Sequence, residues 1–166
     1  MKEKKVTLKY VLAIINCAFM AFVSILTETS LNVTFPTLMK QFHVGLGTVQ
    51  WTTTGYLLMI AIIMVSSSYL NERFSARQLF LTAAIAFIIG SLTAGIANSF
   101  PVLLIGRLIS SFGAGLSIPL LFNLVVELMP RAKWGFYMGI AGLVIVLAPT
   151  LGPTLAAVLF TSLIGV

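Results

Sequence analysis

A carboxylate inside a long apolar stretch is the feature that most constrains this chain. Glu28 lies within the apolar run from Tyr10 to Leu38, and Asn32 follows it one helical turn later. An ionisable group inside a membrane span is penalised by at least ~2.5 kcal/mol on insertion scales, so it usually faces the interior of a helical bundle and marks an ion or proton path. The run therefore predicts a membrane helix that carries a functional polar group.

The composition supports the same interpretation, because 59% of the residues are hydrophobic, only 8% are charged and the mean hydropathy is +1.08. A soluble domain of this size could not cover its surface with so few polar residues. We predict an all-α membrane protein with a short N-terminal segment, residues 1–9, and one membrane domain, residues 10–166. The apolar blocks are each close to or longer than the roughly 20 residues that span a bilayer. The five predicted spans are 10–38, 48–70, 79–97, 101–129 and 135–163.

Most positive charges fall on one side of these spans. Lys40 is the one cationic residue between spans on the opposite side, and the positive-inside rule therefore predicts a cytoplasmic N-terminus in a plasma-membrane protein. The charges are distributed over segments that flank the spans, which argues against a nucleic-acid partner. The residues on the predicted cytoplasmic side are Lys2, Lys4, Lys5, Lys9, Arg73, Arg77, Arg131 and Lys133.

Several classes of chemistry are disfavoured by what the sequence lacks. Cys17 is the single cysteine and His43 the single histidine, so neither a disulfide within the chain nor a zinc or haem site is expected. Aspartate is absent and the four glutamates are scattered, which leaves no hydrolase centre. Asn16 and Ser24 interrupt the first apolar run and disfavour a cleaved secretory signal. We expect no enzyme activity, metal or cofactor.

The polar residues of the first span form a stripe on a helix. Ser24, Glu28 and Asn32 follow at intervals of four residues, and Cys17 falls on nearly the same face. Glu28 lies about 27 Å beyond the start of its span and Arg107 about 9 Å inside span four, which enters from the other side. The two charges can share a depth, and we predict that they pair. In the alternative, Glu28 snorkels to the outer interface from an overlong helix.

Aromatic residues and prolines give two further expectations. Aromatic residues near span ends form a belt at the membrane interface more often than a ligand cage, and this applies to Trp51, Tyr56, Tyr69, Trp134 and Tyr137. Pro149 and Pro153 stand one turn apart in the fifth span. Each removes a backbone hydrogen bond, so a kink is expected there.

Two stretches resemble signatures of the major facilitator superfamily, specifically drug:proton antiporters of the EmrB/QacA type, which include lincomycin-resistance exporters. The stretch 26–36 is similar to the span-one signature L-D-x-T-x-x-N-x-x-x-P, with the acid one position later at Glu28 and with Asn32 and Pro36 retained. The stretch 106–115 is similar to G-R-x-x-Q-G-x-G-A-G. The resemblance implies a role in proton coupling for Arg107.

A third stretch, 68–77, is similar to the superfamily loop G-x-L-A-D-R-x-G-R-K. Glu72 replaces the aspartate, Arg73 matches, and Arg77 keeps the final positive charge. In the family this loop latches the cytoplasmic ends of helices, so the resemblance implies the same role for these three residues.

The fifth span resembles the antiporter signature G-x8-G-x3-G-P-x3-G. Gly139, Gly152 and Pro153 match it, and Ala148 and Ala157 stand in place of two glycines. Together with the other signatures, this resemblance covers nearly the whole chain.

The resemblance implies a helical transporter of twelve or fourteen spans that works by alternating access. The chain stops after the fifth span, so we expect an N-terminal piece whose partners are the lipid bilayer and the missing C-terminal helices. The full-length parent is expected to export lipophilic or cationic drugs in exchange for protons. Two alternatives stay open: a facilitator for a metabolite, and a truncated membrane protein that does not transport.

Overall fold

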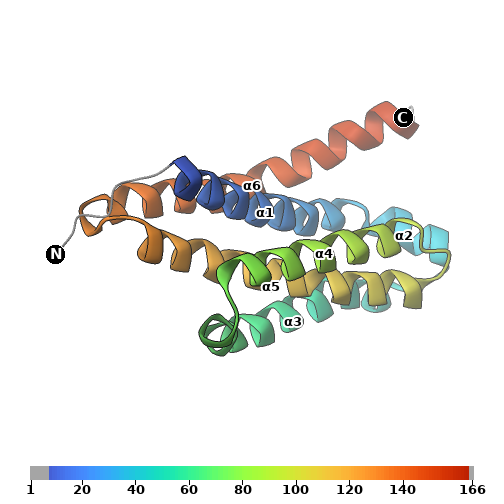
Figure 1. The fold of residues 1–166 in the computed structure, drawn as a ribbon. Helices are drawn as coiled ribbons and strands as arrows, with labels where there is room; N and C mark the ends of the chain where they lie inside the picture. The colour runs from blue at the N-terminus through green and yellow to red at the C-terminus, as the bar shows by residue number, and fades with distance from the viewer. Residues whose placement is uncertain (1–7, 165–166) are drawn as a thin grey trace.

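The computed structural model describes residues 8–164, which form helices joined by short turns and contain no strand (Figure 1). Five of the helices are long and apolar enough to cross a membrane. The elements in chain order are α1 (Leu8–Val33), α2 (Phe35–Phe42), α3 (Leu46–Arg73), α4 (Ala76–Gly95), α5 (Phe100–Leu128), the 3-10 turn η1 (Arg131–Lys133) and α6 (Trp134–Ile164). The fold is therefore an all-α bundle, as the sequence predicts.

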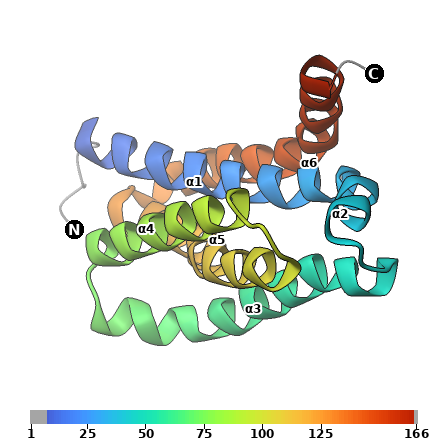
Figure 2. The ribbon, with the colours of Figure 1, turned by 90° about the vertical axis from the view of Figure 1, so that its right-hand side faces the viewer.

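Helix α5 is the centre of the bundle. It packs against α1, α3 and α4 and more lightly against α6, while α1 also packs along α6 (Figures 1 and 2). Unlike the other long helices, α5 has buried residues on most of its circumference. Arg107, Ser110, Ser111 and Ser117 on α5 are therefore enclosed by protein instead of lipid.

The tightest contact in the bundle is between α4 and α5, where glycines from both helices meet. A Cβ atom added to Gly90 would overlap the backbone nitrogen of Ser110, and one added to Gly106 would lie 2.6 Å from the backbone nitrogen of Ala94. Small residues allow such an approach, and packing of this kind is a main source of helix association in membranes. The contact fixes the segment of α5 that contains Arg107.

The first predicted span, 10–38, does not run through as one helix. Helix α1 ends at Val33, Thr34 forms a turn, and α2 begins at Phe35 with Pro36 in its first turn. Proline lacks the N–H that would bond to the carbonyl of Asn32, and its ring clashes with that carbonyl, so α1 cannot continue. The apolar pattern alone did not indicate this break.

The other four spans begin and end within three residues of the predicted positions. The turn between α3 and α4 is shorter than the predicted break, because Ser75 caps α4 directly. Its hydroxyl accepts a hydrogen bond from the Gln78 backbone N–H, and the Ser75 N–H donates to the Gln78 side chain at 3.1 Å. This S-x-x-Q arrangement is a capping box, a motif that can be recognised in the sequence.

Helix α6 includes Pro149 and Pro153 within one continuous helix. Its last part, drawn in red, turns away from the bundle in Figure 2. The bend follows the two prolines in sequence, in agreement with the kink expected there.

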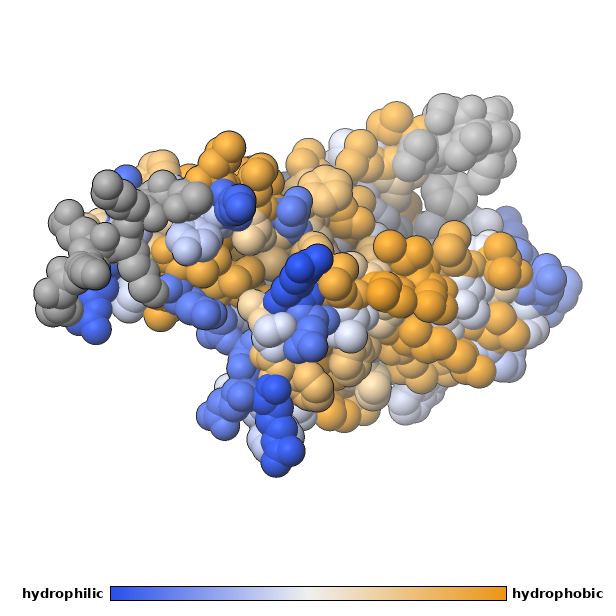
Figure 3. All heavy atoms as spheres, in the orientation of Figure 1, coloured by the Kyte–Doolittle hydropathy of each residue, from blue (hydrophilic) through white to orange (hydrophobic). Residues whose placement is uncertain are grey.

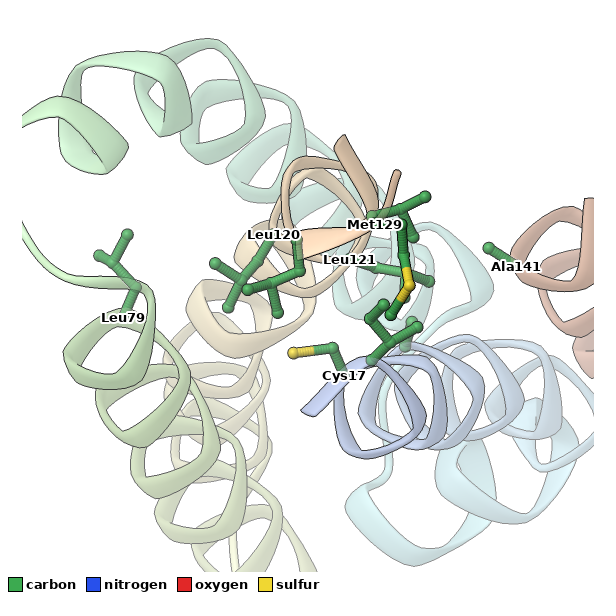
Figure 4. Close-up of a cluster of buried hydrophobic side chains, with 10 residues drawn as sticks. Cys17, Leu79, Leu120, Leu121, Met129 and Ala141 are labelled. Carbon is green, nitrogen blue, oxygen red and sulfur yellow. The ribbon is translucent and has the colours of Figure 1, made fainter. Parts of the chain in front are cut away.

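An apolar core occupies the end of the bundle near the N-terminus, where α1, α4, α5 and α6 meet (Figure 4). Hydrophilic residues gather around the α3–α4 turn and around α2, and apolar residues cover much of the face between them (Figure 3). This core, called the apolar core below, contains Ile14, Cys17, Ala21, Leu79, Leu120, Leu121, Leu124, Val125, Met129 and Ala141.

Candidate functional site

Arg107 lies in the half of the bundle nearest α2, stacked on an aromatic ring. Its guanidinium carbon is 4.0 Å from the centre of the Tyr56 ring, which α3 supplies. Arg107 is only 3% exposed and Tyr56 is 0% exposed. A cation over an aromatic face is attracted by the ring quadrupole, and the attraction grows when both groups are desolvated. The ring is therefore a direct partner of the buried charge.

The hydrogen-bonding groups of this pair are not satisfied within residues 8–164. The Nε and Nη2 atoms of Arg107 and the hydroxyl of Tyr56 are buried without a hydrogen-bond partner there. Buried polar groups are nearly always paired, and each exception calls for an explanation. These three atoms are such exceptions.

Glu28 is half-buried on α1 and interacts electrostatically with both Arg107 and Tyr56. The structure therefore brings the two predicted charges into one site. It does not join them through Nε or Nη2, since those two atoms have no hydrogen-bond partner. Pairing of Glu28 with Arg107 in a full-length transporter stays a prediction.

Asn32 extends the site along α1 and links it to α3. The hydroxyl of Thr53 donates a 3.2 Å hydrogen bond to Asn32 Oδ1. Asn32 is one turn beyond Glu28, and Thr53 is one turn before Tyr56 on a helix that runs in the opposite direction. This bond therefore places Glu28 at the level of Tyr56.

The remainder of the predicted polar stripe has a packing role. Cys17 and Ser24 are both buried. The Ser24 hydroxyl donates to the backbone carbonyl of Met20 at 2.8 Å, one turn earlier in the same helix. Its donor is thus used within α1, so Glu28 and Asn32 are the residues of the stripe that stay candidates for a functional role.

A cavity of about 290 Å³ lies beside Arg107 between α1, α2, α4 and α5. Thr27, Ser91 and Ser110 are among its lining residues, although most of its accessible lining is apolar. No carboxylate of the described residues lines the cavity. It provides space next to the arginine.

The antiporter-like segment of α6 is split between two faces of the helix. Ala148 and Gly152 are buried, and the Ser30 hydroxyl donates to the Gly152 carbonyl at 2.9 Å. A Cβ atom at Gly152 would overlap the hydroxyl oxygen of Thr29. Gly139 and Pro153, in contrast, are exposed, and nothing lies within 4 Å of a Cβ at Gly139. One half of the motif thus packs α6 onto α1 beside the site.

The three residues of the predicted latch lie together at the α3–α4 turn. Glu72 and Arg73 are in the last turn of α3, Arg77 is in the first turn of α4, and all three are exposed. The Arg73 guanidinium carbon lies 5.1 Å from the centre of the Tyr69 ring. Their role as a latch stays a prediction.

Sequence reasoning missed two members of the site. Tyr56 was assigned to an aromatic belt, which is wrong because its ring is completely buried under Arg107. Thr53 was not singled out. Their spacing in the sequence could have indicated them. Thr53 and Tyr56 share one face of a helix that runs antiparallel to the helix of Glu28 and Asn32, so the two pairs can lie at the same level. Elsewhere in the described part of the chain, no three His, Cys, Asp or Glu side chains form a group that could hold a metal ion.

Comparison with known proteins bears on both the fold and the site. The chain is 44% identical over 135 residues to an uncharacterized MFS-type transporter, YhcA, of Bacillus subtilis, covering 81% of this chain and 25% of that protein. It is 39% identical over 149 residues to the lincomycin resistance protein LmrB of Bacillus subtilis, covering 90% of this chain and 31% of that protein. A multidrug resistance protein B homolog of Mycobacterium tuberculosis is 29% identical over 139 residues, covering 84% of this chain and 26% of that protein.

The chain thus spans about a quarter to a third of the length of these relatives. A family model described as Major Facilitator Superfamily matches residues 17–165, which include all five long helices in part or in full and every residue of the site. The chain belongs to the Major Facilitator Superfamily of transporters.

Proposed function

We propose that this chain forms part of a multidrug exporter that exchanges protons for lipophilic or cationic drugs across the plasma membrane. The observation that carries the proposal is the site itself, in which the Glu28 carboxylate lies half-buried within electrostatic reach of the buried Arg107. The similarity to the lincomycin resistance protein supports drugs as the substrate class.

The charges of the site give a simple exchange mechanism. When Glu28 is ionised, its negative charge and the positive charge of Arg107 sum to zero. When Glu28 binds a proton, the site carries a net charge of +1, and a cationic drug is repelled. A proton and a drug cation therefore compete for one carboxylate, which is the requirement for exchange.

Close contacts between helices lie on both sides of this site. Ser30 and Gly152 join α1 to α6 next to Glu28, and Gly90 and Gly106 join α4 to α5 next to Arg107. These contacts hold each charge on a rigid pair of helices. In the full-length transporter, helices beyond residue 166 would complete the cavity, and the surrounding bilayer would cover the apolar surface.

The orientation in the membrane is part of the proposal. By the positive-inside rule, the positively charged segments favour a cytoplasmic position for the N-terminus and for the α3–α4 turn. A cysteine placed at His43, with Cys17 replaced by serine, should then react with a membrane-impermeant reagent added outside intact cells. Labelling from the cytoplasmic face alone would reverse the orientation.

The function can be tested with a full-length transporter that contains this segment, expressed in a strain that lacks other drug pumps. Efflux of a fluorescent lipophilic cation should depend on the proton gradient and stop when a protonophore collapses it. Efflux that survives the protonophore, or that equals the efflux of cells without the transporter, would contradict the proposal.

A further inference from the structure

We propose that Tyr56 is a positioning residue that holds the Arg107 guanidinium on its ring face, so that Arg107 lies beside Glu28 without a permanent ion pair. The proposal rests on the 4.0 Å stacking distance and on the complete burial of the ring. Its functional part also rests on the proton exchange proposed above.

The ring face, and not the hydroxyl, is the part of Tyr56 that acts. The Tyr56 hydroxyl is buried without a hydrogen-bond partner in residues 8–164, so it does not fix the position of Arg107. A ring quadrupole attracts a guanidinium without taking up any of its N–H donors. This agrees with the finding that Nε and Nη2 of Arg107 are unpartnered.

A neutral partner is useful because a second charged group is close by. Glu28 from α1 and Tyr56 from α3 are the titratable groups that interact with Arg107. From α4, the residues that line the cavity next to Arg107 are Ser91, Ala94 and Gly95, none of which is charged. Arg107 therefore has two possible partners, an aromatic ring and a carboxylate.

The choice between these partners bears directly on proton exchange. A direct ion pair would hold the Glu28 carboxylate in its ionised state and oppose proton uptake. When the guanidinium is stacked on Tyr56, its positive charge stabilises the ionised Glu28 carboxylate less than a direct ion pair would. Glu28 then remains able to exchange its proton. The cavity that Arg107 shares with Thr27, the neighbour of Glu28 in sequence, leaves space for the guanidinium to move.

The first test measures stability and does not depend on transport. In the full-length protein purified in detergent, Tyr56→Leu is combined with Arg107→Met in a double-mutant cycle of melting temperatures. Tyr56→Leu should lower the melting temperature by several degrees in the native background and by less than half as much in the Arg107→Met background. Equal losses in both backgrounds would show that Tyr56 only fills space, and would overturn the proposal.

The second test uses conservative variants and measures transport. Tyr56→Phe keeps the ring and should retain proton-driven efflux within about twofold of the native rate, and Tyr56→Leu should lose at least tenfold at an equal amount of folded protein. A tenfold loss in Tyr56→Phe would assign the effect to the hydroxyl and overturn the proposal. Absence of proton-driven efflux in the native protein would contradict the proposed function instead. The double-mutant cycle of melting temperatures would still decide the role of Tyr56.

Discussion

The two ends of the bundle differ in what they bury: one encloses apolar side chains and the other a charged one. In the apolar core, side chains such as Cys17, Leu121 and Met129 fill the space between helices and leave no charge inside (Figure 4). Nearer to α2, helices α1, α3 and α4 lie around Arg107 and leave two of its nitrogens without a hydrogen-bond partner in the described chain. One end is built for stability, and the other keeps a buried charge whose potential partners are only partly engaged.

The contrast shows which contacts make the unusual end possible. A buried charge with open donors is unfavourable, and it is tolerated only where the surroundings hold it in place. Here the glycine contact of α4 with α5 and the ring of Tyr56 do so. We therefore expect substitutions near the N-terminal end to affect folding first, and substitutions at the charged site to affect transport first.

The largest effect on folding is expected in the apolar core. Leu121→Ala removes a completely buried side chain and should lower the free energy of unfolding by about 2–5 kcal/mol through lost contacts and a cavity. Leu92→Ala on α4, where the side chain is exposed, is the matched control and should have little effect. Thermal melting of the purified full-length protein measures both. Similar losses for the two variants would break the comparison between core and surface.

The next effect concerns the helix contact that supports the charged site. Gly90→Ala places a Cβ atom against the backbone of Ser110 and should cost about 1–3 kcal/mol of stability. Gly95→Ala, at the end of the same helix with nothing within 4 Å, is the control and should be neutral or slightly stabilising. Equal melting temperatures for the two variants would show that α4 and α5 approach less closely than described.

Replacement of the buried charge should separate stability from transport. Arg107→Met keeps most of the volume and removes an incompletely partnered cation, so the free energy of unfolding should change by no more than about 1 kcal/mol in either direction. Proton-driven efflux should be lost. A large loss of stability together with intact efflux would reverse the roles that we assign to the two ends.

The smallest effect is expected for the bridge between α1 and α3. Thr53→Val removes the hydroxyl that donates to Asn32 and should cost about 0.6 kcal/mol, the average for hydrogen bonds between membrane helices. Thr93→Val is the control, since its hydroxyl bonds only to Ile89 within α4. A lower melting temperature for Thr93→Val than for Thr53→Val would show that the hydrogen bond between Thr53 and Asn32 does not stabilise the site.

Much of the fold follows from the sequence, because apolar length and turn residues decide where a membrane helix runs. The break at Thr34 was missed because the residues on both sides of it are apolar, and only the backbone chemistry of Pro36 reveals it. Glu28 and Arg107 were found because a charge in an apolar run is conspicuous. Tyr56 was not, because a buried tyrosine and an interfacial one have the same sequence signal, and only the packing of α3 on α5 distinguishes them.

The most direct test of the central claim, that Glu28 near Arg107 exchanges the transported proton, uses Glu28→Gln in full-length transporter reconstituted into vesicles. An imposed pH gradient should no longer drive transport of a lipophilic cation, with a loss of at least tenfold. Glu28→Asp keeps a carboxylate and should retain part of the coupling. Undiminished transport by Glu28→Gln under the same pH gradient would show that the proton is carried elsewhere and would contradict the account.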